Sequence, residues 1–137
     1  MLILPVQGAE HAVKIYPHKL NIISADRESP RSVRSGAKNH LQLNIDDIDF
    51  DDPKHRQLPP KYKFATKDDI LKAVDFAKKH NVHIIHCGAG ISRSPSIAYA
   101  IFRSQGMTKD GAMKKVMELN PHALPNKWIV KLTDEIF

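Results

Sequence analysis

Short apolar runs alternate with longer amphipathic stretches along the chain. Four runs have the length and composition of β-strands: LILPV at 2–6, LNIIS at 20–24, HLQLNI at 40–45 and VHIIH at 82–86. The third alternates apolar and polar positions, as a half-buried strand does. Since the runs are interleaved with helical patterns, they indicate a largely parallel sheet.

Helical periodicity fills most of the remaining chain. The predicted helices cover 9–16, a segment opening at Thr66, Ser94–Gln105, Thr108–Leu119 and the residues from Pro125 onward. Thr66 and Asp69 have the spacing of a capping box. Gly106 directly follows the predicted helix Ser94–Gln105, and helices commonly stop at a glycine. The polar stretches at 25–40 and 49–64 have loop composition. We therefore expect a single α/β domain over residues 1–137, with a central, mostly parallel sheet flanked by helices.

Composition and charge narrow the class of protein. With 137 residues, 42% hydrophobic and 26% charged, the chain is typical of a globular domain. A single cysteine excludes an internal disulfide, and no group of residues has the spacing of metal ligands. No apolar run reaches the length of a membrane span and the N-terminus lacks a basic leader, so we expect a cytoplasmic protein. The net charge of +6 favours anionic partners without choosing among them.

The stretch HCGAGISRSPSI at 86–97 holds the candidate chemistry. It places a glycine-bearing loop between a predicted strand and a helix start, where backbone N–H groups favour an anion. Gly88 and Gly90 would permit unusual dihedral angles and close approach. Arg93 can bind two phosphate oxygens with its planar guanidinium. The same groups would favour the thiolate form of Cys87, so the loop is predicted to bind a phosphate beside a nucleophile.

These residues resemble a known signature. His86, Cys87, Gly90, Arg93 and Ser94 reproduce the HC-x-x-G-x-x-R-S/T motif of the cysteine-dependent protein tyrosine and dual-specificity phosphatases. The segments at 20–24, 41–49 and 124–132 also resemble the family's early strand, acid-loop region and closing helix. The resemblance implies a dual-specificity-phosphatase-like fold and a metal-free, cofactor-free hydrolase.

The resemblance also implies roles for single residues. Cys87 would be the nucleophile, and the phosphate would be bound by the side chain of Arg93 and by the loop residues Gly88, Ala89, Gly90, Ile91 and Ser92. His86 would bond to the backbone around Cys87, and Ser94 would help to expel the sulfur as thiolate. Three simpler interpretations stay open: an inert buried thiol at Cys87, a core histidine at His86 and a helix N-cap at Ser94.

A carboxylic acid is needed to protonate the leaving group. Five candidates follow the third predicted strand: Asp46, Asp47, Asp49, Asp51 and Asp52. The register implied by the resemblance selects Asp47, with the others as alternatives and a solvated loop carboxylate as the simpler interpretation of each. Asn126 matches a family position facing the phosphate loop, although a turn asparagine before a helix explains it equally well.

The substrate is less well determined. The five residues between Cys87 and Arg93 are uncharged, which favours one phosphate over several, and phosphotyrosine is the preferred substrate, with phosphoserine and phosphothreonine as further possibilities. The alternatives are a catalytically silent phosphate- or phosphopeptide-binding module and a phosphatase for non-protein phosphate esters. A nucleic-acid binder is not expected, because basic helices and interleaved aromatic residues are missing. The physiological substrate and the oligomeric state are not predicted.

Overall fold

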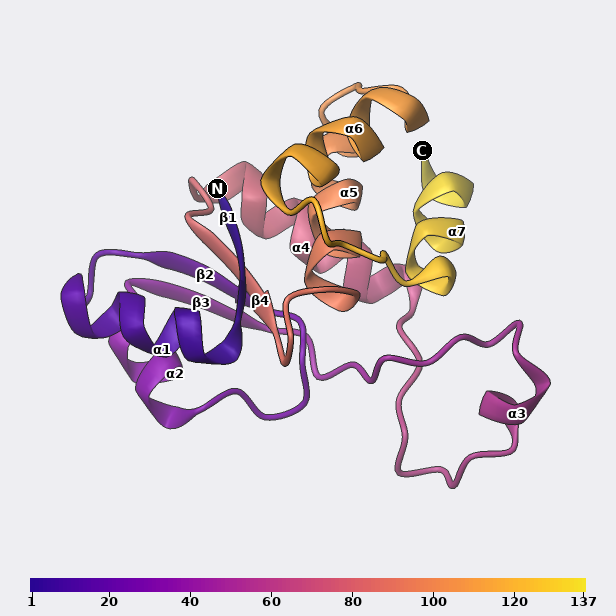
Figure 1. Cartoon of the computed structure of the whole chain (residues 1–137), viewed down its shortest axis with the longest axis horizontal. Helices are drawn as coiled ribbons and strands as arrows, with labels where there is room; N and C mark the ends of the chain where they lie inside the picture. The colour runs from indigo at the N-terminus through magenta and orange to yellow at the C-terminus, as the bar shows by residue number, and fades with distance from the viewer.

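A four-stranded parallel sheet runs through the centre of the molecule (Figure 1). The computed structural model describes all residues, 1–137. The strands are β1 (Leu2–Pro5), β2 (Asn21–Ser24), β3 (Asn39–Gln42) and β4 (Ile84–Cys87). Their order in the sheet is β1-β4-β2-β3, and every neighbouring pair is parallel. The predicted α/β class with a parallel sheet is confirmed.

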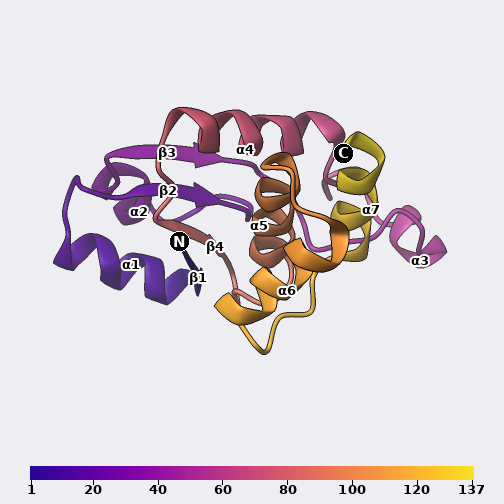
Figure 2. The ribbon, with the colours of Figure 1, turned by 90° about the horizontal axis from the view of Figure 1, so that it is seen from above.

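Helices cover both faces of this sheet (Figure 2). They are α1 (Val6–Ile15), α2 (Arg31–Gly36), α3 (Pro53–Arg56), α4 (Lys67–Lys79), α5 (Arg93–Ser104), α6 (Lys109–Leu119) and α7 (Lys127–Ile136). Successive strand side chains point to opposite faces. Ile22 and Ile84 therefore pack against α1 and α2, whereas Ile23 and Ile85 belong to the larger core beneath α4 and α5.

Helix α5 is the central helix of the larger core. Its residues from Ser94 to Phe102 are all buried, because α4, α6 and α7 each pack against it. A helix surrounded in this way needs apolar or small residues on every side, which the sequence SPSIAYAIF supplies. The N-terminus of α5 is thereby fixed against the end of β4.

Local signals explain the ends of the predicted helices. The capping box at the start of α4 is present: the Thr66 hydroxyl accepts from the Asp69 N–H, and the Asp69 carboxylate accepts from the Thr66 N–H. Thr108 caps α6 and Asn126 caps α7 through their side chains. These ends were predicted within a few residues.

Two expectations about the connecting segments are wrong. The stretch 25–40 is not entirely loop, because it contains α2, a six-residue helix with no side-chain cap and only Val33 buried. The stretch 49–64 contains a single helical turn, α3, which follows the capping residue Asp52. The third strand is also shorter than expected, since β3 ends at Gln42.

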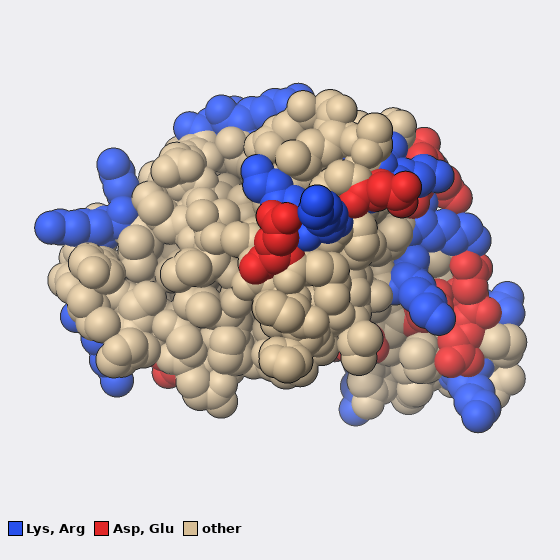
Figure 3. Space-filling model, turned by 45° about the horizontal axis from the view of Figure 1, so that its top comes forward, with Lys and Arg blue, Asp and Glu red and all other residues tan.

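Charge on the surface is dispersed. On the face in Figure 3, lysines and arginines lie at several separate places, and acidic side chains lie beside those at the centre and right of the view. Four lysine–carboxylate pairs are exposed on both sides: Lys67 with Glu135, Lys72 with Asp68, Lys79 with Asp75 and Lys131 with Asp51. None of the helices combines the length and the apolar character that crossing a bilayer requires.

Candidate active site

The candidate site lies at the carboxyl end of β4, in the middle of the sheet. The loop formed by residues 87–93, here called the cysteine loop, joins the last residue of β4 to the first residue of α5. In parallel α/β sheets, ligands bind at this end of the strands, and the start of a helix presents unpaired N–H groups. The predicted placement of the loop between strand and helix is confirmed.

The carbonyl groups of the cysteine loop are bonded from outside it. Gly88 O accepts from Val6 N at 3.0 Å, Gly90 O from Asn120 Nδ2 at 2.8 Å, Ile91 O from Leu124 N at 2.8 Å and Ser92 O from Ser96 Oγ at 2.7 Å. The N–H groups of residues 88, 89, 91 and 92 donate no hydrogen bond within the protein. These four residues are half-buried or exposed, so their N–H groups form a set of accessible donors for an anion.

Gly90 occupies the one position of the cysteine loop where the geometry requires glycine. Its φ of +74° is in the left-handed region, and a Cβ there would lie 2.7 Å from Leu4 C and 2.8 Å from Pro5 N. Gly88 differs, because its φ is not positive and a Cβ would meet only Arg93 Nη2, at 3.6 Å. The expectation that both glycines supply unusual dihedral angles is therefore wrong for Gly88 and confirmed for Gly90.

The thiol of Cys87 lies at the base of the loop, 2% exposed. Its Sγ accepts a hydrogen bond from the Gly90 N–H at 3.3 Å and lies 3.2 Å from the hydroxyl oxygen of the fully buried Ser94. Both groups can donate to a thiolate, and the N-terminus of α5 adds its partial positive charge. The sulfur therefore lies among hydrogen-bond donors at the start of a helix.

The side chain of Arg93 extends from the start of α5 to the acidic segment. One guanidinium nitrogen, Nη1, donates to Ile45 O at 2.9 Å. The other terminal nitrogen, Nη2, lies near Gly88, at the start of the cysteine loop. One side of the guanidinium thus fixes its orientation, while the other faces the loop with donors that suit phosphate oxygens.

Of the five candidate carboxylates, Asp47 is the one bonded to the cysteine loop. Its Oδ1 accepts from Ser92 Oγ at 2.7 Å and from Asn126 Nδ2 at 2.9 Å. The other four are bonded elsewhere: Asp46 to Arg27 and Lys63 N, Asp49 to Asp51 N, Asp51 to Lys131, and Asp52 to Lys54 N. The geometry therefore favours the register that selected Asp47.

The segment before α7 braces the site. Asn126 bonds to Asp47 and to Ile48 O through Nδ2, while its Oδ1 accepts from Ile129 N as the cap of α7. The turn-and-cap interpretation of this residue is confirmed, whereas its side-chain amide contacts the acidic segment and only its backbone N–H reaches the cysteine loop, at Ser92 O. Ser96 and Asn120, which the sequence analysis did not single out, bond to loop carbonyls. An asparagine before a proline at a helix end is the one local signal that Asn120 offered.

Comparison with known proteins adds independent information. No family model matches the chain. Human dual specificity protein phosphatase 8 is 41% identical over 61 residues, which are 43% of this chain, and the mouse protein aligns equally well. The matched part spans only 10% of the human relative. The sequence similarity is therefore local.

Three solved structures align over nearly the whole chain. Human tyrosine phosphatase-like serine/threonine/tyrosine-interacting protein has a TM-score of 0.69 at 18% identity, covering 96% of this chain and 87% of that one. Human DUSP28 has a TM-score of 0.67 at 16% identity, covering 98% of this chain and 88% of that one. This chain has the dual-specificity phosphatase fold. PTPMT1 in complex with PI(5)P has a TM-score of 0.65 at 18% identity, covering 96% of this chain and 85% of that one.

Within this dual-specificity phosphatase fold, His86 lies fully buried directly before Cys87 at the end of β4. Its Nε2 is 2.6 Å from Ser24 Oγ, and Ser24 Oγ is 2.7 Å from His40 Nε2. The other nitrogen, Nδ1, lies 3.4 Å from Cys87 O and 3.8 Å from an oxygen of Asp26. Burial lowers the pKa of His86, and the Asp26 charge opposes this only in part. His86 is therefore neutral near pH 7.

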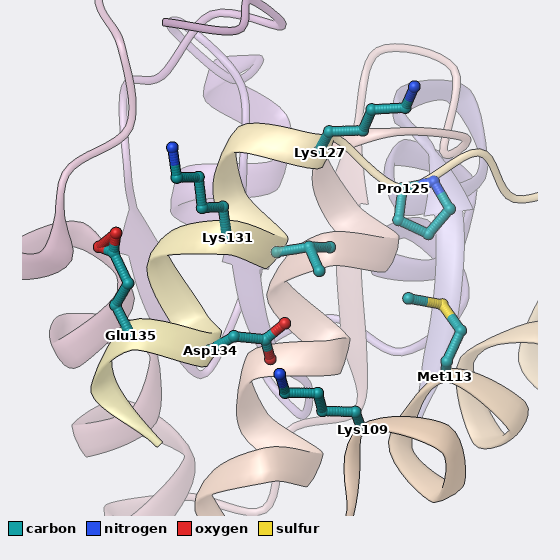
Figure 4. Close-up of a pocket in the computed structure, with 8 residues that line it drawn as sticks. Lys109, Met113, Pro125, Lys127, Lys131, Asp134 and Glu135 are labelled. Carbon is teal, nitrogen blue, oxygen red and sulfur yellow. The ribbon is translucent and has the colours of Figure 1, made fainter. Parts of the chain in front are cut away.

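The largest hollow in this phosphatase fold is not at the cysteine loop. It lies between α6 and α7, measures about 610 Å³, and is lined by Lys109, Met113, Pro125, Lys127, Val130, Lys131, Asp134 and Glu135 (Figure 4). Lys127 and Lys131 extend outward from α7 in this view. Asp134 is already bonded to Arg103 and Tyr99. With no thiol or imidazole in its lining, the hollow lacks the chemistry found at Cys87.

Proposed function

We propose that residues 1–137 form a phosphatase catalytic domain that hydrolyses phosphate monoesters of proteins, phosphotyrosine above all, through a phosphocysteine intermediate. The observation that carries the proposal is the position of Cys87 Sγ, which contacts the Gly90 N–H and Ser94 Oγ inside a loop to which Asp47 is bonded. A nucleophile, anion donors and an acid thus occupy one site. The dual-specificity phosphatase fold supports the same conclusion.

In the first step, the thiolate of Cys87 attacks phosphorus, and the bond from phosphorus to the leaving oxygen breaks. The free N–H groups of the cysteine loop and the guanidinium of Arg93 stabilise the charge on the three equatorial oxygens. Asp47, protonated at this stage, gives its proton to the leaving oxygen, so that tyrosine departs as a neutral phenol. Its bonds to Ser92 and Asn126 keep it at the loop.

In the second step, water attacks the phosphocysteine. Asp47, now a carboxylate, accepts a proton from this water, and the sulfur–phosphorus bond breaks to release phosphate. The Ser94 hydroxyl, 3.2 Å from Sγ, donates to the departing thiolate. The same carboxylate acts first as acid and then as base, which returns the site to its starting state.

The cysteine loop favours substrates with a single phosphate. Arg93 is its only charged residue, and the side chains between Cys87 and Arg93 are small or apolar. A second phosphate would find no cationic partner in the loop itself. Although PTPMT1, solved in complex with PI(5)P, shares this fold, the loop favours a phosphoprotein over a phosphoinositide.

The proposal is tested by measuring hydrolysis of p-nitrophenyl phosphate and of a phosphotyrosine peptide in EDTA. We expect turnover by the wild-type chain and none above background by Cys87→Ser. A Ser104→Ala variant is a matched control for a serine hydroxyl, because Ser104 lies at the far end of α5 and bonds only to Ile101 O. Trapping of phosphate on sulfur in acid-quenched samples would identify the intermediate.

An inactive but folded wild-type chain would overturn the enzymatic proposal. If that chain still bound vanadate or a phosphotyrosine peptide, the silent binding module would replace it. The fold shared with a serine/threonine/tyrosine-interacting protein makes this outcome a meaningful alternative. Turnover of phosphoinositides faster than of phosphopeptides would instead support the non-protein substrate class.

A further inference from the structure

A row of hydrogen bonds connects the surface of the molecule to the base of the nucleophile. It runs from His40 on β3 through Ser24 on β2 to His86 on β4, with heteroatom distances of 2.7 and 2.6 Å. His86 and Ser24 are fully buried, whereas His40 borders a hollow of about 340 Å³ between β3 and α4. The three strands are neighbours in the sheet: Ser24 lies opposite His86, whereas His40 lies opposite Ile22 and reaches Ser24 diagonally.

The positions of the protons in this row follow from the acceptors around His86. Its Nδ1 faces two acceptors, the carbonyl of Cys87 and the carboxylate of Asp26, so a lone pair at Nδ1 would be repelled by both. Nδ1 must therefore carry the hydrogen. In a neutral imidazole the other nitrogen is then an acceptor, and it accepts from the Ser24 hydroxyl. The Ser24 oxygen in turn accepts from the Nε2–H of His40.

We propose that Ser24 and His40 are positioning residues that hold His86 in its Nδ1–H form, with this hydrogen directed at the carbonyl of Cys87. The proposal rests on the proposed function, because it assigns the two residues to the support of the same nucleophile. Neither residue contacts the substrate. They act only through His86, in the way that outer hydrogen-bond partners fix the tautomer of a functional histidine.

The effect on Cys87 is electrostatic and geometric. The Nδ1–H group adds a partial positive charge beside the residue whose sulfur becomes negative. It also fixes the backbone that aims Sγ at the Gly90 N–H and at Ser94. If His86 turned to its other tautomer, a lone pair would face the Cys87 carbonyl, and the thiolate would lose part of its stabilisation.

The charges around the row are consistent with two neutral histidines. Burial lowers the pKa of both His86 and His40. The charge of Asp26 opposes this for both, while Arg34 lowers the pKa of His40 further and Arg93 that of His86. The charged and titratable groups that face the row are Glu10, Asp26, Arg34 and Arg93, with Lys72, Asp75, Lys79 and His80 of α4 around the hollow beside His40. Asp26 is the nearest carboxylate, and it favours a hydrogen on Nδ1.

The test measures the rate of Cys87 alkylation by iodoacetate as a function of pH, which reports how much thiolate is present without requiring turnover. In Ser24→Ala and His40→Leu, we expect the midpoint of the rate profile to move up by about one pH unit, equivalent to about tenfold slower alkylation below the midpoint. His40→Gln is the matched control, because its amide N–H can replace Nε2–H, and its profile should follow wild type.

A second readout addresses the tautomer directly. In ¹⁵N spectra of histidine-labelled protein, His86 of the wild type should show a protonated Nδ1 and an unprotonated Nε2, and His40→Leu should weaken or reverse this assignment. If folded Ser24→Ala and His40→Leu both alkylate along the wild-type profile, the proposal is wrong. If the alkylation profiles shift but neither the wild type nor any variant hydrolyses phosphopeptides, the positioning role stands and the proposed phosphatase function fails.

Discussion

The two halves of the candidate site are built in different ways. The cysteine loop is short and is bonded to its surroundings through four carbonyl groups, and Gly90 packs directly against the backbone of β1. The acidic segment at 43–65 is long and has one four-residue helix, and its catalytic candidate Asp47 is exposed. It meets the cysteine loop through single hydrogen bonds at Ser92 and Arg93, and it meets the segment before α7 through two hydrogen bonds from Asn126.

The difference suits a site in which the cysteine loop is held in a fixed position and the acidic segment can adjust its position. The nucleophile and the anion donors need fixed positions, because they stabilise charge only when their dipoles are already oriented. The acid must approach leaving groups of different sizes, so a tether of a few hydrogen bonds serves it better than burial. We therefore expect substitutions in the cysteine loop to alter stability, and substitutions in the acidic segment to alter turnover alone.

Among the variants that compare the two halves, Asp47→Asn should have the largest effect. Loss of the proton donor should lower kcat for a phosphotyrosine peptide about 10²- to 10⁴-fold. The loss should be smaller for p-nitrophenyl phosphate, whose leaving group departs without a proton. Steady-state kinetics on both substrates measure this difference. Asp51→Asn is the control, because Asp51 bonds to the exposed Lys131 instead; an equal loss in both variants would contradict the assignment of the acid.

Gly90→Ala should have the next largest effect, and it should appear in stability. A methyl group there combines a left-handed backbone with contacts below 3 Å to Leu4 and Pro5, so we expect the free energy of unfolding to fall by about 3 kcal/mol. Gly88→Ala, which meets only Arg93 Nη2, should lose less than about 1 kcal/mol. Urea denaturation of the two variants makes the comparison. Similar losses would show that the two glycines do not differ as their geometry implies.

Asn126 connects the two halves, and its two roles can be separated. Asn126→Ala removes both the cap of α7 and the bond to Asp47, so we expect a loss of about 1 kcal/mol in stability and about tenfold in kcat. Asn126→Ser retains a capping hydroxyl that is too short to reach Asp47. It should recover most of the stability but not the turnover. Recovery of both by serine would mean that the bond to Asp47 has no catalytic value.

The smallest effect concerns pH and the buried histidines. Burial lowers the pKa of His86 and His40 below 6.5 in the folded state, so the unfolded chain binds protons more readily. Their contribution to stability is therefore complete above about pH 6.5 and is lost as pH falls toward the folded-state pKa. The free energy of unfolding, measured by urea denaturation across this range, should fall less steeply in His40→Gln than in wild type. If the free energy of unfolding depended on pH equally in His40→Gln and wild type, His40 would not contribute to this pH dependence.

Much of the nucleophile half could be predicted from the sequence, because its signals are local. An apolar strand, a glycine-bearing loop and a helix start follow one another within residues 82–105, and the capping residues Thr66 and Thr108 mark helix ends in the same direct way. The choice of Asp47 depended on register, and the structure places that residue at the loop through contacts spanning 45 and 79 positions in sequence.

The remaining parts depend on contacts between distant residues. Helix α2 has no capping side chain and buries only Val33, so its helical state reflects packing on α1 and β2 and not local propensity. Nothing in the sequence connects Ser24 and His40 with His86, because their hydrogen bonds form only when β2, β3 and β4 lie side by side. Serine and asparagine at positions 96 and 120 carry no pattern that links them to loop carbonyls.

The position of β1 has a consequence for the order in which the protein folds. This strand is made before the other three, yet it pairs only with β4, which is the last of them to be made. Until β4 is synthesised, β1 has no neighbour in the sheet, and the contacts of Leu4 and Pro5 with Gly90 cannot form. The segment from Asn120 to Asn126, which completes the support of the loop, comes later still. A nascent chain therefore exposes an ordinary thiol at Cys87, and the hydrogen-bonded loop around it is one of the last features to form.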